Sequence, residues 1–189
     1  VQGPRSSNVA GGAASPFLAR WGASGAPEFT TQPVSGSSCP GGPALFDLVV
    51  NSSDSPSYQW QVESPADSGV YVDLTGASFN EAETGLEFAF AGADLATLSV
   101  TGVKLRGHAN VIRLVGRATN SCGSATSDVA TLTICAADFT CDHFVNGDDY
   151  DAFASVFDVA DPAADMNFDG FVNGDDYDAW CARTLTAVS

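Results

Sequence analysis

Apolar and polar residues alternate along most of the chain, which is the pattern of β-strands rather than helices. From Phe29 to Ile134, runs rich in Val, Thr, Leu and Tyr follow a period of two and are separated by clusters of Gly, Pro, Ser and Asn. Short strands at this spacing are typical of an antiparallel β-sandwich. We predict strands at residues 29–34, 44–50, 57–62, 69–74, 86–90, 96–103, 110–119 and 125–134.

A helical period begins only near the carboxyl end, where we predict helices at residues 148–157 and 175–184. The expected fold class is therefore mainly β, with an antiparallel β-sandwich followed by a small α-helical module. We place an amino-terminal arm at residues 1–28, the sandwich at residues 29–134 and the module at residues 135–189. The arm is rich in Gly, Ala, Ser and Pro, as flexible segments are.

The charge of the chain narrows the classes of partner. The 189 residues include 23 acidic and 7 basic side chains, giving a formal charge of −16 and a pI near 4.1. This balance argues against a nucleic-acid binder, because phosphate contacts need a surface of Lys and Arg. It also disfavours binding to anionic lipid, and no apolar run reaches the roughly 18 residues of a membrane span. We expect a mature, soluble product from which a signal peptide has been removed.

The acidic residues concentrate in the module and follow an internal repeat. Residues 135–189 hold twelve Asp and one Arg, a net charge of −11. The segment FVNGDDYDA at residues 144–152 recurs unchanged at residues 171–179, a shift of 27. A solvated acidic tail does not repeat in this way, so we expect these carboxylates to have a local role.

Each copy of the repeat has the ligand spacing of a twelve-residue calcium loop, in which positions 1, 3, 5, 7, 9 and 12 supply oxygen. Position 7 contributes a backbone carbonyl, position 9 a water-mediated contact and the others side chains. We predict two calcium ions, held by Asp138, Thr140, Asp142, Phe144, Asn146 and Asp149, and by Asp165, Asn167, Asp169, Phe171, Asn173 and Asp176. The alternative is a pair of acidic helix-capping turns without metal, which leaves many carboxylates unneutralised.

Residues 136–183 resemble the tandem loop–helix repeats of dockerin modules. Dockerin loops have Asp at position 12, as at Asp149 and Asp176, and lack the helix that enters an ordinary EF-hand. The second loop, DMNFDGFVNGDD, fits throughout, whereas the first, DFTCDHFVNGDD, has Thr140 at position 3 and His143 in place of Gly at position 6. A left-handed His costs about 1 kcal/mol, so we expect the first site to be weaker. The resemblance implies a calcium-dependent module that binds a β-sandwich partner.

Residues 39–134 resemble bacterial immunoglobulin-like domains. The resemblance rests on CPGGPALFDL at residues 39–48, YQW at 58–60, LATLSV at 95–100 and ATNSCGSATSDVATLTI at 118–134. It implies that Trp60 packs in the core, and that Leu48 and Gly116 take the places of the two inter-sheet cysteines of antibody domains. Bacterial relatives often carry the pair represented here by Cys39 and Cys122, which implies a disulfide between them.

The five cysteines leave other pairings open and one residue unpaired. In a plain immunoglobulin topology Cys39 and Cys122 lie near opposite ends, so pairing of Cys39 with Cys135 is geometrically easier. Cys141 or Cys135 with Cys181 would clamp the module. No CxxC spacing occurs, which argues against zinc or redox chemistry. Disulfides together with calcium loops indicate an extracellular or cell-surface protein.

The arm contains one apolar cluster, formed by Phe17, Leu18 and Trp21. A flexible leader needs no such cluster, so we expect residues 15–22 to dock on an edge strand of their own sandwich or on a neighbouring chain. Sugars are a further possibility, since Asn51-Ser52-Ser53 is a glycosylation-type sequence and the many Ser and Thr residues permit O-linked glycans.

No catalytic motif is present: GxSxG, HExxH, P-loop and GxGxxG patterns do not occur, and His108 and His143 lie far apart in sequence. We therefore expect no enzyme, but a secreted structural protein that assembles head to tail into an extracellular filament or surface layer. The module of one copy would bind the sandwich or arm of the next. The contacts would come from Tyr150, Phe153, Tyr177 and Trp180, which we expect to be shared between the module core and the interface. The alternative is a cell-surface adhesion or targeting module, whose sandwich binds glycan or protein while the dockerin-like module attaches to a separate scaffold.

Overall fold

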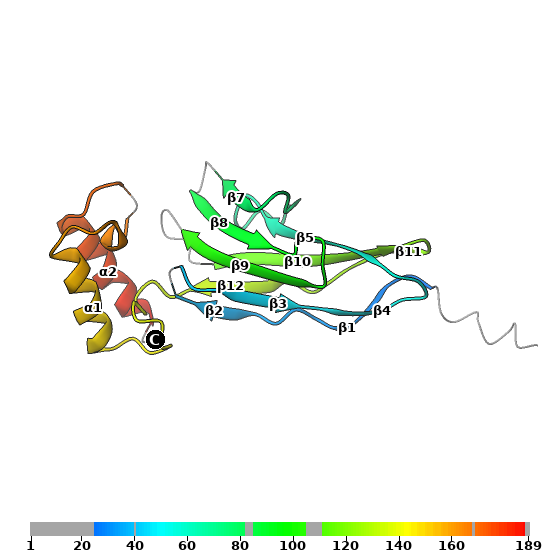
Figure 1. Cartoon of the computed structure of the whole chain (residues 1–189), viewed down its shortest axis with the longest axis horizontal. Helices are drawn as coiled ribbons and strands as arrows, with labels where there is room; N and C mark the ends of the chain where they lie inside the picture. The colour runs from blue at the N-terminus through cyan, green and yellow to red at the C-terminus, as the bar shows by residue number, and fades with distance from the viewer. Residues whose placement is uncertain (1–24, 40, 82–84, 105–110, 168, 188–189) are drawn as a thin grey trace, which may run out of the picture.

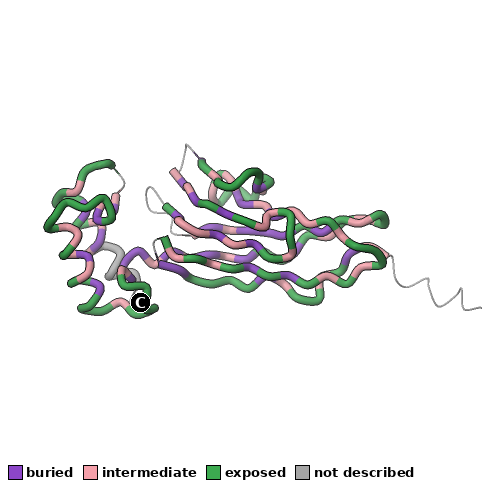
Figure 2. Tube along the Cα trace, in the orientation of Figure 1, coloured by how far each residue is buried: buried purple, intermediate pink, exposed green. Residues whose placement is uncertain are grey.

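The computed structural model describes residues 25–39, 41–81, 85–104, 111–167 and 169–187, with the backbone alone after Cys181. Two β-sheets share one core, and a pair of helices lies beyond one end of them (Figure 1). Buried and exposed positions are interleaved along the strands, as expected when one face of each sheet lies in a core (Figure 2). The predicted antiparallel β-sandwich is therefore confirmed.

The strand order is that of an immunoglobulin-type sandwich, in which β3–β9–β8 and β5–β10–β12 correspond to the B–E–D and C–F–G neighbours. The larger sheet contains β2 (Gly36–Ser38), β12 (Ala130–Ile134), β10 (Val111–Asn120), β5 (Ser57–Glu63) and β6 (Tyr71–Asp73), with β11 (Gly123–Thr126) paired to β10. The second sheet contains β3 (Ala44–Asp47), β9 (Thr97–Lys104), β8 (Leu86–Ala91) and β7 (Ser78–Glu81). A separate ribbon joins β1 (Glu28–Thr31) to β4 (Val49–Asn51).

The strand predictions fail mainly at the edges of the sheets. The short edge strands β2 and β7 were not predicted, and β2 lacks apolar alternation because it consists of Gly and Ser alone. The predicted strand at residues 44–50 divides at the buried Leu48 into β3 and β4, which pair with β9 and β1. The predicted strand at residues 125–134 likewise divides into β11 and β12.

Trp60 forms the centre of the sandwich core. Its side chain is fully buried, its ring centroid lies 6.3 Å from that of Phe46, and its indole Nε1 donates a hydrogen bond to the carbonyl of Leu95 at 3.0 Å. A Cβ atom at Gly116 would come within 2.3 Å of Leu48 Cδ2. Leu48 thus fills the space of an inter-sheet disulfide above the tryptophan, and the predicted roles of these core positions are confirmed.

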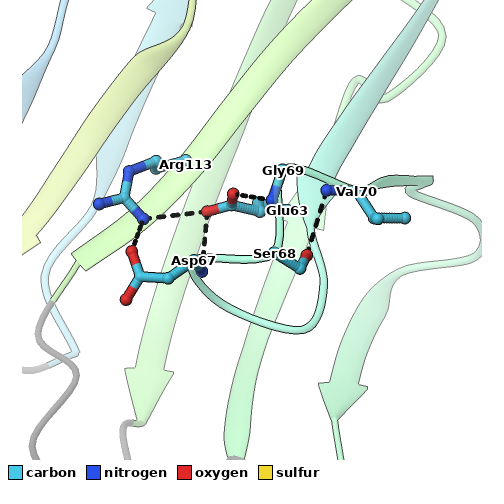
Figure 3. A network of polar contacts seen from close by, with 6 residues as sticks. All are labelled: Glu63, Asp67, Ser68, Gly69, Val70 and Arg113. Carbon is cyan, nitrogen blue, oxygen red and sulfur yellow. Dashed lines mark hydrogen bonds and ion pairs between the residues drawn. The ribbon is translucent and has the colours of Figure 1, made fainter.

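A buried carboxylate organises the loop between β5 and β6. Glu63 accepts backbone hydrogen bonds from Gly69 at 2.7 Å and Asp67 at 3.2 Å, and Arg113 on β10 donates to both Glu63 and Asp67 (Figure 3). Burial raises the pKa of Glu63, but the bonds from Gly69 and Arg113 outweigh it, so the net pKa lies below the usual value. The ion pair fixes the loop to the sheet. Its carboxylates are bonded to groups of the chain itself, so we interpret it as a structural feature and not as a binding site.

The two ends of the sandwich are occupied by different parts of the chain. β1, β4 and the β10–β11 turn lie at the end away from the helices (Figure 1). Gly25 also lies at this end, where its carbonyl accepts hydrogen bonds from Asn120 Nδ2 at 2.6 Å and from Ser53 Oγ at 2.9 Å. The arm therefore joins the sandwich at the end opposite the helical module.

Two helices and a short 3₁₀ turn form the module: α1 (Gly147–Phe157), η2 (Pro162–Ala164) and α2 (Gly174–Ala187). Asn146 caps α1 in a capping box with Asp149, which explains a helix start within one residue of the prediction. The module has its own buried cluster, in which Phe153 and Trp180 stack with ring centroids 5.2 Å apart. α2 extends three residues beyond the predicted end.

A disulfide joins the module to the sandwich. Cys39, at the end of β2, is bonded to Cys141 in the loop before α1, with their Cα atoms 5.3 Å apart. Beside it, the backbone N–H of Cys135 donates to the Ser38 carbonyl at 2.9 Å, and Ala136 packs in the module cluster. The module is therefore attached to the end of the sandwich at two adjacent places, through the chain after β12 and through the disulfide.

Candidate metal centre

Three carboxylates converge in the loop before α1. Asp138, Asp142 and Asp149 each present an oxygen atom, and these atoms all lie within 4.8 Å of one another. Asp138 is 3% exposed and Asp149 is fully buried. Buried carboxylates of like charge repel one another unless they are protonated or share a cation. Their spacing matches the reach of a single hard cation with oxygen ligands.

Backbone N–H groups orient these carboxylates. Asp149 accepts hydrogen bonds from the N–H and Oγ1 of Thr140 at 2.9 and 3.0 Å and from the N–H of Asn146 at 2.8 Å. Burial raises the pKa of Asp149, but the bonds from Thr140 and Asn146 outweigh it, so the net pKa is lowered. Asp138 accepts from the N–H groups of Asp142 and His143, at 3.1 and 3.0 Å. The carboxylate of Asp149 is thus held in its charged form.

The second loop repeats these hydrogen bonds 27 residues later. Asp165 accepts from the N–H groups of Asp169 and Gly170, as Asp138 does from the equivalent residues. Asp176, which is fully buried, accepts from the N–H groups of Met166, Asn167 and Asn173 at 2.8–3.1 Å. Asp142 and Asp169 both accept from the residue two positions later. The repeat in the sequence is therefore a repeat in the conformation and bonding of the loops.

The donor set fits Ca²⁺ by its chemistry. The side chains at positions 1, 3, 5, 9 and 12 of each loop end in oxygen acceptors, and a hydrogen-bonded carboxylate oxygen keeps a second lone pair. Phe144 and Phe171, at position 7, are 69% and 71% exposed, so their side chains have no role in the loop and only the carbonyls serve as candidate ligands. The hydrogen bonds also suit a capped turn, so the two interpretations differ chiefly in how the carboxylate charge is balanced.

His143 adopts the left-handed conformation that the sequence predicts, with φ of 70°, and Cys141 beside it has φ of 62°. The second loop has Gly170 at the position of His143, with φ of 91°. Replacing His143 with Gly will remove side-chain strain and raise the stability of the module by about 1 kcal/mol. Thermal unfolding in calcium tests this expectation. Gly170→Ala provides the reciprocal change and must lower the stability.

The predicted interface residues divide into buried and exposed positions. Phe153 is fully buried and Trp180 is 6% exposed, so both lie in the module core, as predicted, and their contact with a partner stays a prediction. Their flat rings stack inside the helical pair, because burial of both faces removes more apolar area from water than a half-exposed position. Tyr150 and Tyr177 remain exposed. Phe17, Leu18 and Trp21 lie outside the described residues.

The predicted disulfide pairings are wrong. Cys39–Cys122, Cys39–Cys135 and pairing of Cys181 with Cys135 or Cys141 are all replaced by Cys39–Cys141. Cys122 cannot reach Cys39, because it lies in the turn after β10 beside Gly25 and Ser53, at the far end of the sandwich. Cys135 follows β12 and keeps its thiol. Cys141 lies at position 4 of the calcium-loop pattern, between two ligand positions. This position outside the ligand set was the one feature of the sequence indicating that Cys141 could bond to a residue outside its own loop.

The acidic residues Asp151 and Asp178 were not singled out by the sequence. Both are exposed, follow an exposed tyrosine and lie outside the ligand positions.

Within the parts of the chain that the structure describes, no helix is long and apolar enough to cross a membrane.

Comparisons with known proteins add little support for the immunoglobulin-type fold beyond what the strand order already gives. No protein-family model and no curated protein matches the chain. A chimeric titin Z1Z2 protein functionalized with a decorin peptide is 27% identical, with a TM-score of 0.37 over 58% of this chain and 94% of that chain. The titin M3 domain is 18% identical, with a TM-score of 0.34 over 57% and 95%. The N-terminal Ig1-2 module of the Drosophila receptor protein tyrosine phosphatase DLAR is 19% identical, with a TM-score of 0.38 over 59% and 50%. At these TM-scores the immunoglobulin-type fold rests on the strand order and the Trp60 core alone.

Proposed function

We propose that this protein is an extracellular structural subunit that assembles head to tail. The dockerin-like module of one copy binds the arm end of the next copy. A single observation carries the proposal: the arm and the module leave opposite ends of the sandwich, held by Asn120 at one end and by the Cys39–Cys141 bond at the other. Each copy thus presents two different surfaces that point in opposite directions.

Such a contact is heterologous, because a different surface from each copy takes part. Heterologous contacts between like subunits extend into filaments or layers unless their rotation closes a ring. The double attachment of the module favours extension, since a module held by a disulfide and by the chain after β12 keeps one orientation. A freely hinged module would allow short closed rings.

Calcium would act on the module by preorganisation. Bound in the two loops, the ions would neutralise carboxylates that otherwise repel and would hold α1 and α2 in the geometry that binds a partner. Two ions would bring the net charge of residues 135–189 from −11 to −7. The chain's own contribution is to orient Asp149 and Asp176 through backbone hydrogen bonds before the metal arrives.

Electron microscopy and sedimentation velocity of the full chain, in millimolar calcium and then in excess chelator, test the proposal. We expect fibres or sheets in calcium and disassembly after chelation. The D165A/D169A variant removes two predicted ligands and must remain monomeric, whereas D94A, an exposed acid on the sandwich, must assemble normally. Monomers that persist at high concentration in calcium contradict self-assembly and favour the scaffold-attached adhesion module instead.

A further inference from the structure

Two exposed tyrosines form one continuous surface on the module. Tyr150 and Tyr177 occupy equivalent positions of the repeat and are 44% and 39% exposed. The side chain of Tyr177 forms hydrogen bonds with Cys181 and with Tyr150, and these neighbours raise its pKa. Tyr150 also lies over Trp180, with ring centroids 5.7 Å apart. Tyr150 and Tyr177 therefore form a half-exposed aromatic pair between α1 and α2.

Two exposed acidic residues lie beside this pair. Asp151 and Asp178 directly follow the tyrosines, are exposed and take part in no ion pair found among the described residues. They lie outside the calcium-loop positions and beyond the first helical turn, where an acid would stabilise the helix dipole. Asp is a weak helix former, so an Asp at the same position of both helices lowers helix stability. A role of the two carboxylates in binding would account for their presence.

The arm has the complementary chemistry. Residues 1–27 contain Arg5 and Arg20 and no acidic residue, so the arm is cationic in a chain with charge −16. Arg20 lies within the apolar cluster PFLARW at residues 16–21. Tyr, Trp and Arg are the residues enriched at the centres of protein interfaces, and guanidinium groups stack on aromatic rings while pairing with carboxylates.

We propose that residues 15–22 of one copy dock on the surface formed by Tyr150, Asp151, Tyr177 and Asp178 of its neighbour. Arg20 pairs with the carboxylates, and the apolar residues around it cover the tyrosine rings. Phe17 lies eight positions before Gly25, a span of up to about 27 Å, which lets the cluster reach beyond its own sandwich. This inference rests on the proposed function, because it assigns the two surfaces of the head-to-tail contact.

The binding step is tested directly with a fluorescent peptide of residues 12–24, GAASPFLARWGAS. The peptide is titrated in calcium into the full chain carrying R20E, whose own arm no longer competes. We expect binding to this chain, and binding about tenfold or more weaker to the D151R/D178R chain with Arg20 unchanged, because like charges then face each other. D94R on the sandwich must leave the affinity unchanged. Calcium titration of the D151R/D178R chain must match that of the parent chain, which shows that the module remains folded.

The assembly step uses charge reversal in the full chain. Chains with R20E or with D151R/D178R must each stay monomeric in calcium. An equal mixture of the two must assemble, because each arm then meets a surface of opposite charge on the other chain, and a chain carrying all three changes must assemble again. Absence of peptide binding, or equal affinity for the chains with and without D151R/D178R, overturns the inference. Assembly of R20E chains into normal fibres also overturns it while leaving head-to-tail assembly intact. Failure of the unmodified chain to assemble contradicts the proposed function instead, and the peptide titration still decides the docking site.

Discussion

Replacing Asp176 with Ala will unfold the helical module while the sandwich stays folded. The buried carboxylate accepts hydrogen bonds from three backbone N–H groups, and its loss leaves all three without an acceptor. At about 1–3 kcal/mol for each buried unsatisfied group, the loss exceeds the stability expected of so small a unit. Far-UV circular dichroism will show loss of the helical signal, and the near-UV signal of the buried Trp60 will remain.

Asp178→Ala is the matched control, because it removes an exposed carboxylate two residues away in the same helix. It must leave the helical signal and the calcium affinity unchanged. Asp149→Ala, the equivalent change in the first loop, must unfold the module less completely, because the disulfide at Cys141 still holds that loop to the sandwich. A folded module in the Asp176→Ala chain contradicts the structural role of the carboxylate.

Replacing both Cys39 and Cys141 with Ser will give the second large effect. The bond closes a loop with a sequence separation of 102, and loops of about 100 residues lose roughly 4 to 5 kcal/mol of stabilisation when opened, by the chain-entropy estimate. Because the module is then attached through one segment alone, we also expect it to unfold in a separate transition, at lower denaturant concentration than the sandwich.

Urea unfolding followed by the helical signal for the module and by amide hydrogen exchange of β5 and β10 for the sandwich measures both effects. The control is Cys122→Ser, which removes an exposed thiol at the opposite end of the sandwich and must leave the transitions in place. A single transition with an unchanged midpoint in the double variant contradicts both the bond and its coupling role.

The parts of the structure that local chemistry determines were predictable. Both helix starts follow from Asn at the cap with Asp three residues later, and the loop hydrogen bonds repeat because the residues repeat. The core position of Trp60 is the one implied by the resemblance of YQW to an immunoglobulin-type strand. These features depend on residues near one another in sequence.

The features that were missed depend on residues far apart in sequence. Cys39 and Cys141 meet only because β2 pairs in parallel with β12 and brings the end of β2 to the start of the module. The ion pair of Glu63 with Arg113 joins strands 50 residues apart. No spacing rule in a single sequence encodes such contacts.

The disulfide also determines how the chain would carry mechanical tension. A pull between the arm and α2 passes from β1 through β2 to Cys39, crosses the sulfur–sulfur bond to Cys141 and continues into α1. The residues between the two cysteines, which include β3 to β12, lie in a closed covalent loop outside this path. A chain without the bond could lengthen by roughly 350 Å as those residues unravel. In the oxidised chain these residues stay inside the closed loop, so the subunit resists stretching even if the sandwich opens.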